Sequence, residues 1–330
     1  MISPAYGLVL AALAAASLTP LASSAQAQAY PTRPITIMVP LAAGTGMDSL
    51  VRLYGEKLSQ RLGKPVVVDN RPGAGLTLAT AAVAAAPADG YTLLVATSGP
   101  MAIGPAIYKK LNYDARNDFV PIAFYVRSPF ILIANPDLPF KTLPEFMKHA
   151  KESATPLNYS SVGPGSPQHL VMELVKHRFG LPMTHVPYRN SGQAVTDTAA
   201  GHVQVGFAEA GASIPVIRDG KVRALAVSAT TRLPLLPDVP PFSEAAGAPD
   251  FEAVSWHILF APAKTPREIV ERLHAEMKEI MADPEMQQRA AAIGLIPQKV
   301  PSIEETQAYV RSEQDKWGAL VKAVGMEGTQ

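Results

Sequence analysis

The stretch VPLAAGTGMD, Val39 to Asp48, joins an apolar run to a small-residue loop with two glycines and then an acid. The apolar run predicts a β-strand, and the three- and four-residue spacing of apolar residues after it predicts a helix from Met47 to Leu62. Glycines at such a turn let a ligand approach the backbone, and a helix start presents unpaired N–H groups with partial positive charge. The stretch therefore predicts an anion-binding loop in an α/β fold.

The same alternation of short apolar runs and helix-length segments continues along the chain and predicts β–α–β units. Strands are expected at 35–39, 66–68, 92–96, 130–134, 158–161, 184–186, 203–208 and 224–227. Helix starts are expected at Thr142 with Glu145, at Ser166, at Thr265 with Glu268, and at Ser302 with Glu305. We expect two α/β lobes, residues 30–126 plus 256–330 and residues 127–255, with mixed sheets, flanking helices and a cleft between the lobes.

Composition and the first residues indicate an exported protein. Residues 1–29 carry no charged side chain, hold an apolar stretch too short to span a bilayer, and end in small-x-small sites, so they predict a signal peptide. The absence of cysteine excludes disulfides, thiolate metal sites and a lipoprotein anchor. The net charge of +1 with dispersed basic residues disfavours nucleic acid and anionic membranes as partners. We expect a soluble periplasmic protein without stable membrane anchoring.

Two more glycine pairs lie between an expected strand and an expected helix, at Gly73-Ala74-Gly75 and at Gly163-Pro164-Gly165. If the strands carry all three loops to a shared edge, the loops form a carboxylate- or phosphate-binding cleft. No Gly-Lys-Ser/Thr sequence follows any of them, which disfavours a nucleoside triphosphate.

Two enzymatic functions have less support in the sequence than ligand binding. A dinucleotide-binding oxidoreductase would use Asp69 as its ribose acid, but Ser49 stands where the closing glycine is expected. A secreted hydrolase would need a nucleophile motif, and no Gly-x-Ser-x-Gly sequence occurs. His169 and His177 are expected on one helix with Glu173, and no third metal ligand is apparent in the sequence. We therefore expect binding without catalytic residues, metal or cofactor, with both alternatives left open.

Two acids are ambiguous. Asp48 has a structural role if it pairs with Arg52, one helical turn away, and a binding role if it meets a ligand amine. Glu209 follows the strand at 203–208 and, if buried, must meet a donor. Tyr188 and Arg189 are the expected donors.

In order and spacing, several motifs resemble the periplasmic solute receptors of tripartite tricarboxylate transporters, the Bug or TctC-type family. The stretches that carry the resemblance are NRPGAG (70–75), YRNSGQAVTDTAAGHVQVGF (188–207), DGKVRALAVSATTRLPLLPDVPPFSEAAG (219–247) and the run from Trp256 to Pro266. The similarity covers about Tyr30 to Gly325. It implies a type II periplasmic-binding-protein fold that closes on a small organic carboxylate, without catalysis, metal or cofactor, and delivers it to membrane subunits of the transporter.

The resemblance also implies which residues surround the ligand. In the first lobe they are Leu41, Ala43, Gly44, Thr45, Gly46, Met47, Asp48, Gly73, Ala74, Gly75, Thr97 and Ser98; in the second they are Ser161, Gly163, Ser166, His169, Ala208 and Glu209. The chain departs from the family pattern at Ala43, Thr45 and Met47, where proline, glycine and threonine are usual. Met47 is expected to add apolar surface, which favours a ligand with an apolar or aromatic body.

Overall fold

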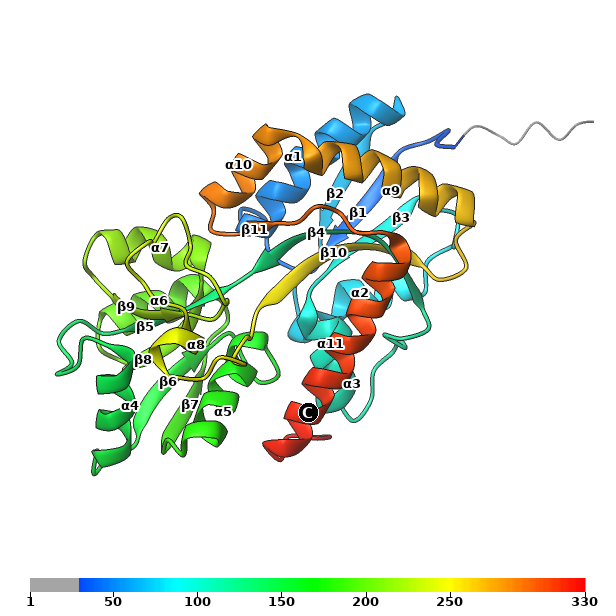
Figure 1. The fold of residues 1–330 in the computed structure, drawn as a ribbon. Helices are drawn as coiled ribbons and strands as arrows, with labels where there is room; N and C mark the ends of the chain where they lie inside the picture. The colour runs from blue at the N-terminus through cyan, green and yellow to red at the C-terminus, as the bar shows by residue number, and fades with distance from the viewer. Residues whose placement is uncertain (1–29, 330) are drawn as a thin grey trace, which may run out of the picture.

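The computed structural model describes residues 30–329, and the expected signal peptide lies outside them. Two mixed sheets, each flanked by helices, form two lobes (Figure 1). The sheet of lobe 1 has the strand order β11-β4-β10-β3-β1-β2, and that of lobe 2 has the order β7-β6-β8-β5-β9. Across this described range, no helix is both long enough and apolar enough to cross a membrane.

Lobe 1 is formed by two separate parts of the chain. Its elements are β1 (Ile35–Val39), α1 (Gly46–Leu62), β2 (Val66–Asn70), the 3₁₀ turn η1 (Ala74–Leu76), α2 (Thr77–Ala84), β3 (Thr92–Ala96), the π-helical turn η2 (Gly99–Ile103), α3 (Gly104–Ile107), β4 (Phe119–Ser128), β10 (Ser255–Pro262), α9 (Arg267–Ala282), α10 (Pro284–Ala292), β11 (Ile296–Pro297) and α11 (Ile303–Ala323). Strands β1, β2 and β3 run parallel, so their carboxyl ends share one edge of the sheet.

Lobe 2 is formed by the intervening residues. Its elements are β5 (Phe130–Ala134), α4 (Leu143–Glu152), β6 (Leu157–Ser161), α5 (Pro167–Phe179), β7 (Met183–Pro187), α6 (Ser191–Ala199), β8 (Val205–Glu209), α7 (Ala210–Arg218), β9 (Arg223–Val227) and α8 (Phe242–Ala245). Strands β6, β7 and β8 are parallel, so their carboxyl ends also share one edge.

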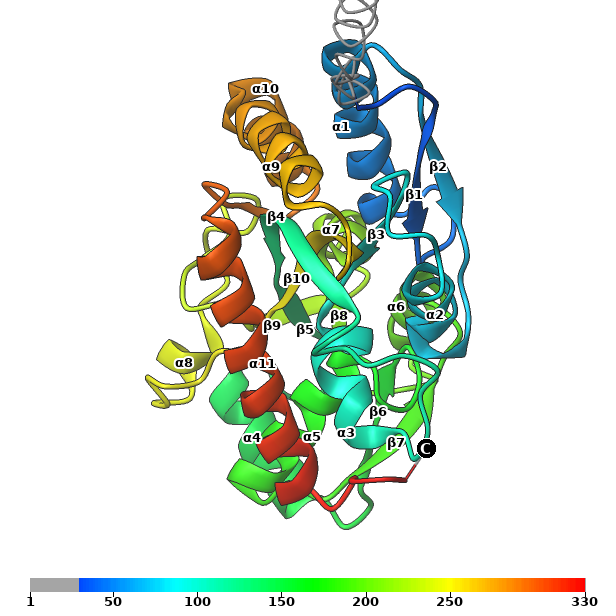
Figure 2. The same cartoon turned by 90° about the vertical axis from the view of Figure 1, so that its right-hand side faces the viewer.

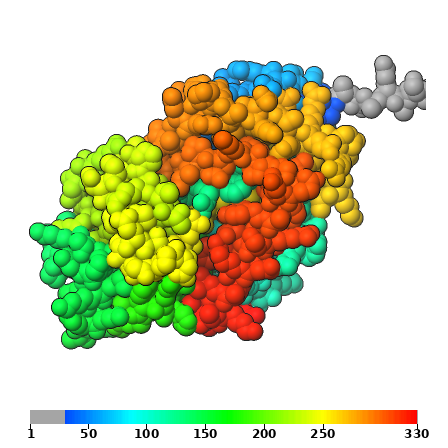
Figure 3. Space-filling model, in the orientation of Figure 1, coloured from blue at the N-terminus to red at the C-terminus, as the bar shows by residue number. Residues whose placement is uncertain are grey.

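The chain crosses between the lobes twice, at adjacent places. Strand β4 ends at Ser128 and β5 begins at Phe130 in the other sheet, while β10 begins at Ser255, which pairs with Ser128. These crossings support the expected lobe boundaries near 126 and 255, which we propose for this chain, with β4 remaining in the lobe 1 sheet to Ser128. Figure 3 shows the surface hollowed between the yellow part of lobe 2 and the orange and red parts of lobe 1.

Alternation along the strands divides the core of lobe 1 between two faces of its sheet. Leu93 and Val95 pack with α1, α9 and α10, whereas Leu94 and Ala96 pack with α2, α3 and α11. Figure 2 shows α1 and α9 at one end of the lobe and α11 running down its side. The C-terminal helix packs on lobe 1, as the sequence predicted.

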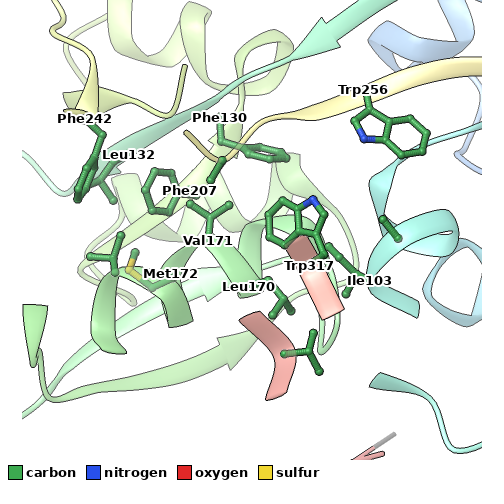
Figure 4. Packing of buried hydrophobic residues seen from close by; sticks show 14 of the residues in the cluster. Ile103, Phe130, Leu132, Leu170, Val171, Met172, Phe207, Phe242, Trp256 and Trp317 are labelled. Atoms are coloured by element: carbon green, nitrogen blue, oxygen red, sulfur yellow. The ribbon is translucent and has the colours of Figure 1, made fainter. Parts of the chain in front are cut away.

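The cluster under α11 also continues into lobe 2. It contains Ile103 and Trp317 of lobe 1 together with Phe130 and Leu170 of lobe 2. Figure 4 shows the Trp317 ring lying among these side chains. The two lobes therefore share an apolar contact in addition to the two crossing strands.

Most of the predicted helix starts are confirmed. Thr142 and Ser302 form capping boxes with Glu145 and Glu305, and Ser166 caps α5. The cap predicted at Thr265 is wrong. Helix α9 begins at Arg267, and Pro266, which has an extended backbone, occupies the capping position in place of Thr265. The Thr265 hydroxyl is buried and has no hydrogen-bond partner in the described structure.

Candidate ligand-binding junction between the lobes

The carboxyl edges of the two sheets meet, and we call this region the interlobe junction. A methyl group built on Gly99, after β3, would lie 3.6 Å from Pro167 Cδ at the start of α5 and 3.7 Å from Leu76 Cδ1. One built on Gly165 would lie 3.2 Å from Ile107 of α3. At the other side of the junction, Gly294 of lobe 1 approaches Ala210 of lobe 2. The loops after β2, β3 and β6 are thus brought together, and the segment after β8 meets the turn before β11.

In the loop after β1, Asp48 is the organising residue. Its carboxylate accepts hydrogen bonds from the Gly44 N–H at 2.8 Å, from Arg52 Nε at 3.0 Å and from Asn70 Nδ2 at 2.9 Å. Asn70 also donates to the Leu41 carbonyl at 2.9 Å, which ties this loop to the end of β2. Burial opposes ionisation of Asp48, but the bonds from Arg52, Gly44 and Asn70 outweigh it and lower its pKa. These contacts give Asp48 the structural role that the sequence left open.

These hydrogen bonds within the protein also determine which N–H groups of this loop remain free to bind a ligand. The Gly44 N–H is engaged by Asp48, and Thr45 caps α1 by accepting from the Asp48 N–H. The N–H groups of Gly46 and Met47 have no partner in residues 30–329, as expected for the first turn of a helix. The Met47 side chain, 3% exposed, packs in the lobe 1 core, so the prediction that it adds apolar surface to the site is wrong.

The loop after β2 has an unusual backbone. Gly73, Ala74, Gly75 and Leu76 all have positive φ, including two residues that are not glycine. Their turn is closed by the bond from the Leu76 N–H to the Gly73 carbonyl at 2.9 Å. The N–H groups of Gly73, Ala74 and Gly75 have no partner among the described residues. Strained backbone of this kind is concentrated at functional sites, and here it presents three consecutive donors.

The two side chains after β3 have different environments. The Thr97 hydroxyl is buried and has no hydrogen-bond partner in the described part of the chain. A methyl group built on Gly99 would lie 3.6 Å from it, at the same point that Leu76 and Pro167 approach. Ser98, in contrast, is fully buried and bonded to the hydroxyl of Ser255 at 2.9 Å, at the crossing between lobes. Thr97 therefore offers a free polar group to the junction, and Ser98 connects the end of β3 to the crossing between the lobes.

The glycine loop after β6 is not the third anion cradle that the sequence predicted. The Gly163 N–H donates to Ser161 Oγ at 3.1 Å, the Gly165 N–H donates to His169 Nδ1 at 3.2 Å, and Pro164 has no N–H. Ser166 caps α5, and its hydroxyl donates to the Gly163 carbonyl at 2.7 Å. The two glycine donors are engaged within lobe 2, and the loop instead forms a contact surface for lobe 1.

A stack of rings supports that loop from beneath. The rings of His169 and His185 lie 4.0 Å apart, and Tyr159 continues the stack at 5.0 Å from His185. His185 Nε2 meets Ser161 Oγ at 2.6 Å, and Tyr159 donates to Glu173, which also accepts from Lys176. Burial lowers the pKa of both histidines to about 4; for His169 the neighbouring His185 adds to the effect. The side chains of Ser161 and His169 thus hold the loop from within.

We expect folding stability to fall as the pH drops from about 6.5 towards 4. The folded pKa of about 4 at His169 and His185 lies below the ordinary value of 6.5, so the unfolded chain takes up protons first. The loss is at most about 1.4 kcal/mol per pH unit for each histidine, and less for the more exposed His185. Melting curves at pH 7, 6 and 5 should show a smaller decrease in His169→Gln than in wild type. The exposed His202→Gln is the control, and equal decreases in all three proteins would contradict this account.

Glu209 ends β8 and lies on the face of the lobe 2 sheet that α5 covers, since its neighbour Ala208 packs on the opposite face. Burial raises the pKa of Glu209, and the nearby Gln168 side chain opposes the shift. Neither expected donor, Tyr188 or Arg189, hydrogen-bonds to the Glu209 side chain within residues 30–329. The Gln168 side chain is its polar neighbour instead, and Tyr188 lies near Asp197. Gln168 was missed because its contact with Glu209 joins two elements far apart in sequence. Glu209 forms no ion pair within the described range.

Catalytic geometry is incomplete at this site. The Ser161–His185 contact has no carboxylate bonded to the histidine in residues 30–329, so the orienting acid of a hydrolase triad is missing there. The same residues contain no group of three or more histidine or acidic side chains placed to hold a metal ion.

A family model and several relatives match this chain. A family model described as "Tripartite tricarboxylate transporter family receptor" matches residues 50–326. Protein BugT of Bordetella pertussis is 32% identical over 92% of this chain and 93% of its own. A "UPF0065 protein in tcbD-tcbE intergenic region" of Pseudomonas sp. strain P51 is 35% identical over 98% of this chain and 95% of its own.

Solved structures show the same fold. The R. palustris protein Rpa4515 with adipate superposes with a TM-score of 0.82 at 33% identity, over 90% of this chain and 98% of its own. MatC from Rhodopseudomonas palustris with bound malate gives a TM-score of 0.77 at 32% identity, over 88% of this chain and all of its own. None of these relatives supports the hydrolase alternative.

Proposed function

Because this chain belongs to the receptor family of tripartite tricarboxylate transporters, we propose that it binds a small organic carboxylate at the interlobe junction. One observation carries the proposal. Five backbone N–H groups without partners in the described structure, at Gly46, Met47 and 73–75, lie on adjacent loops of one sheet edge. The unpartnered Thr97 hydroxyl follows the next strand of that edge.

The free N–H groups can supply a large share of the gross binding free energy of a carboxylate. A hydrogen bond to a charged group contributes roughly 1.5 to 3 kcal/mol. Micromolar affinity corresponds to about 8 kcal/mol, so four or five such bonds supply most of it before ordering costs. The loops are already held in place by Asp48, Asn70 and the left-handed turn, which reduces the entropy lost on binding. No covalent step is needed, and we assign the chain no catalytic residue.

The ligand itself is argued from charge and from the relatives. The solved relatives hold adipate and malate, and an anionic head suits the free N–H groups on the lobe 1 edge. We place the carboxylate head against Gly46, Met47, Gly73, Ala74, Gly75 and Thr97. The remaining residues expected from the family, among them Ser161, Ser166, His169 and Glu209, shape the lobe 2 side, mostly by supporting its loops.

Location and partners complete the proposal. Residues 1–29 have the composition of a signal peptide, and a family of this kind acts outside the cytoplasm. We assign the chain to the periplasm and its ligand delivery to membrane subunits of a tripartite tricarboxylate transporter. Opening and closing would take place at the crossings near Ser128 and Ser255.

A thermal-shift screen tests the function. Purified residues 30–330 should gain melting temperature, saturably, with one or a few members of a panel of aliphatic, hydroxylated, amino and aromatic carboxylates. The ligand should be recovered unchanged after incubation. Turnover of a panel member without a shift, or no shift across a panel that includes adipate and malate, would contradict the proposal.

A further inference from the structure

Leu76 has a backbone conformation that its side chain disfavours. Its φ is 72° and its ψ is 5°, in the left-handed region where non-glycine residues other than Asn and Asp are uncommon. The residue stands at the start of α2, where its carbonyl accepts from the Thr80 hydroxyl at 3.1 Å. A glycine would adopt the same backbone without strain. A leucine at this position therefore needs an explanation in what its side chain contacts.

The side chain points into the interlobe junction. Leu76 Cδ1 and Pro167 Cδ, from lobe 1 and lobe 2, both lie within 3.7 Å of the point where a Gly99 side chain would begin. The unpartnered Thr97 hydroxyl lies 3.6 Å from that point. A second apolar contact of the same kind, between Ile107 and Gly165, joins the lobes nearby. One side of the junction is thus apolar, with atoms from both lobes.

Leu76 is distinct from the other apolar residues around these loops. Met47 is buried in the lobe 1 core. Leu78, two residues further along α2, is 52% exposed; its Cδ2 lies 3.7 Å from a methyl group built on Gly73 and is not among the contacts of the Gly99 position. Leu76 is half-buried and follows directly on the three free N–H groups of 73–75. A carboxylate held by those donors would have its next atoms beside the Leu76 side chain.

We propose that Leu76 determines ligand specificity by forming, with Pro167, an apolar wall for the hydrocarbon part of the carboxylate ligand. This inference rests on the proposed function and adds a selection rule to it. Ligands with a longer methylene chain gain contact with the wall, whereas short hydroxylated ligands leave polar groups against it. The chain should therefore favour adipate over succinate and malate.

The test is calorimetric titration of succinate, malate and adipate into wild type, Leu76→Asn and Leu76→Gly, with Leu78→Asn as the matched control. Asparagine tolerates the left-handed backbone and is of similar size, so it removes the apolar contact while preserving the turn. One buried methylene corresponds to about a fourfold change in affinity. Wild type and Leu78→Asn should prefer adipate over succinate by about tenfold, and both Leu76 variants should lose most of this preference.

Three outcomes would contradict the inference, and one of them also bears on the receptor function. Preference for adipate that survives in both Leu76 variants, or wild-type preference for succinate or malate, contradicts the role of Leu76 while leaving the receptor function intact. Wild type that binds none of the three ligands removes the inference and counts against the receptor function itself. Melting temperatures of the two Leu76 variants within about 5 °C of wild type would show that the turn is preserved.

Discussion

Replacing Asp48 by alanine is expected to lower the free energy of unfolding by about 2 to 3 kcal/mol and to weaken carboxylate binding by at least about tenfold. The carboxylate is 3% exposed and receives three different donors, from Gly44, Arg52 and Asn70. Without it, the Gly44 and Asn70 donors lose their acceptor in a partly buried site. The loop would then be free to turn its N–H groups away from the ligand position. Urea unfolding and calorimetric titration measure the two effects.

Asp69 provides the matched control for this prediction. It ends the neighbouring strand β2 and pairs with Arg71 at 2.9 Å, but its side chain is 34% exposed. Asp69→Ala should change stability by less than about 1 kcal/mol, as is usual for an exposed ion pair. If Asp48→Ala were as mild as Asp69→Ala in both measurements, the organising role of Asp48 would be wrong.

Replacing Gly75 by alanine is expected to abolish measurable carboxylate binding, a loss of at least about 100-fold, and to destabilise the fold by roughly 1 to 3 kcal/mol. The new methyl group would lie 2.0 Å from the Tyr108 hydroxyl oxygen, and the backbone has a φ of 61°. Either the loop or Tyr108 must move. Movement of the loop displaces the three donors of 73–75, so binding should suffer more than folding.

A second substitution separates these causes. Tyr108→Phe removes the hydroxyl and leaves the ring carbon 3.2 Å from the new methyl group, so Gly75→Ala with Tyr108→Phe should regain part of the affinity. Gly318→Ala, in α11 with nothing within 4 Å of the added methyl group, should behave like wild type. Full affinity in Gly75→Ala alone would refute the assignment of this loop to the ligand.

Local sequence patterns predicted most of the secondary structure. The strands at 35–39 and 92–96 and the capping boxes at Thr142 and Ser302 agree with the structure because they depend on residues a few positions apart. The cap at Thr265 failed for a local reason as well: Pro266 lies outside the helix, a distinction that the sequence alone does not make.

The structure agrees with the expected composition of the site only in part. Parallel strands bring the loops after β1 and β2 to one edge of the lobe 1 sheet, and the loop with Gly165 contacts Ile107 of lobe 1. Which N–H groups remain free depends on how nearby side chains are oriented. The His169 ring accepts from the Gly165 N–H four residues earlier, in an orientation set by its packing against His185 and Tyr159, which the sequence pattern does not show. The left-handed Leu76 and the Gln168 contact of Glu209 are likewise set by tertiary packing. Most of the side chains that were expected to touch the ligand instead hold the loops in place. Backbone N–H groups are the donors that remain free to bind a ligand.

The most direct measurement is a titration of the ¹⁵N-labelled protein with a carboxylate from the thermal-shift screen, followed by amide chemical shifts. The account predicts saturable downfield shifts concentrated at the N–H groups of Gly46, Met47, Gly73, Ala74 and Gly75, with smaller changes at Gly163 and Gly165, whose donors are already engaged. Saturable shifts that centre elsewhere on the molecule, with those five amides unmoved, would contradict it.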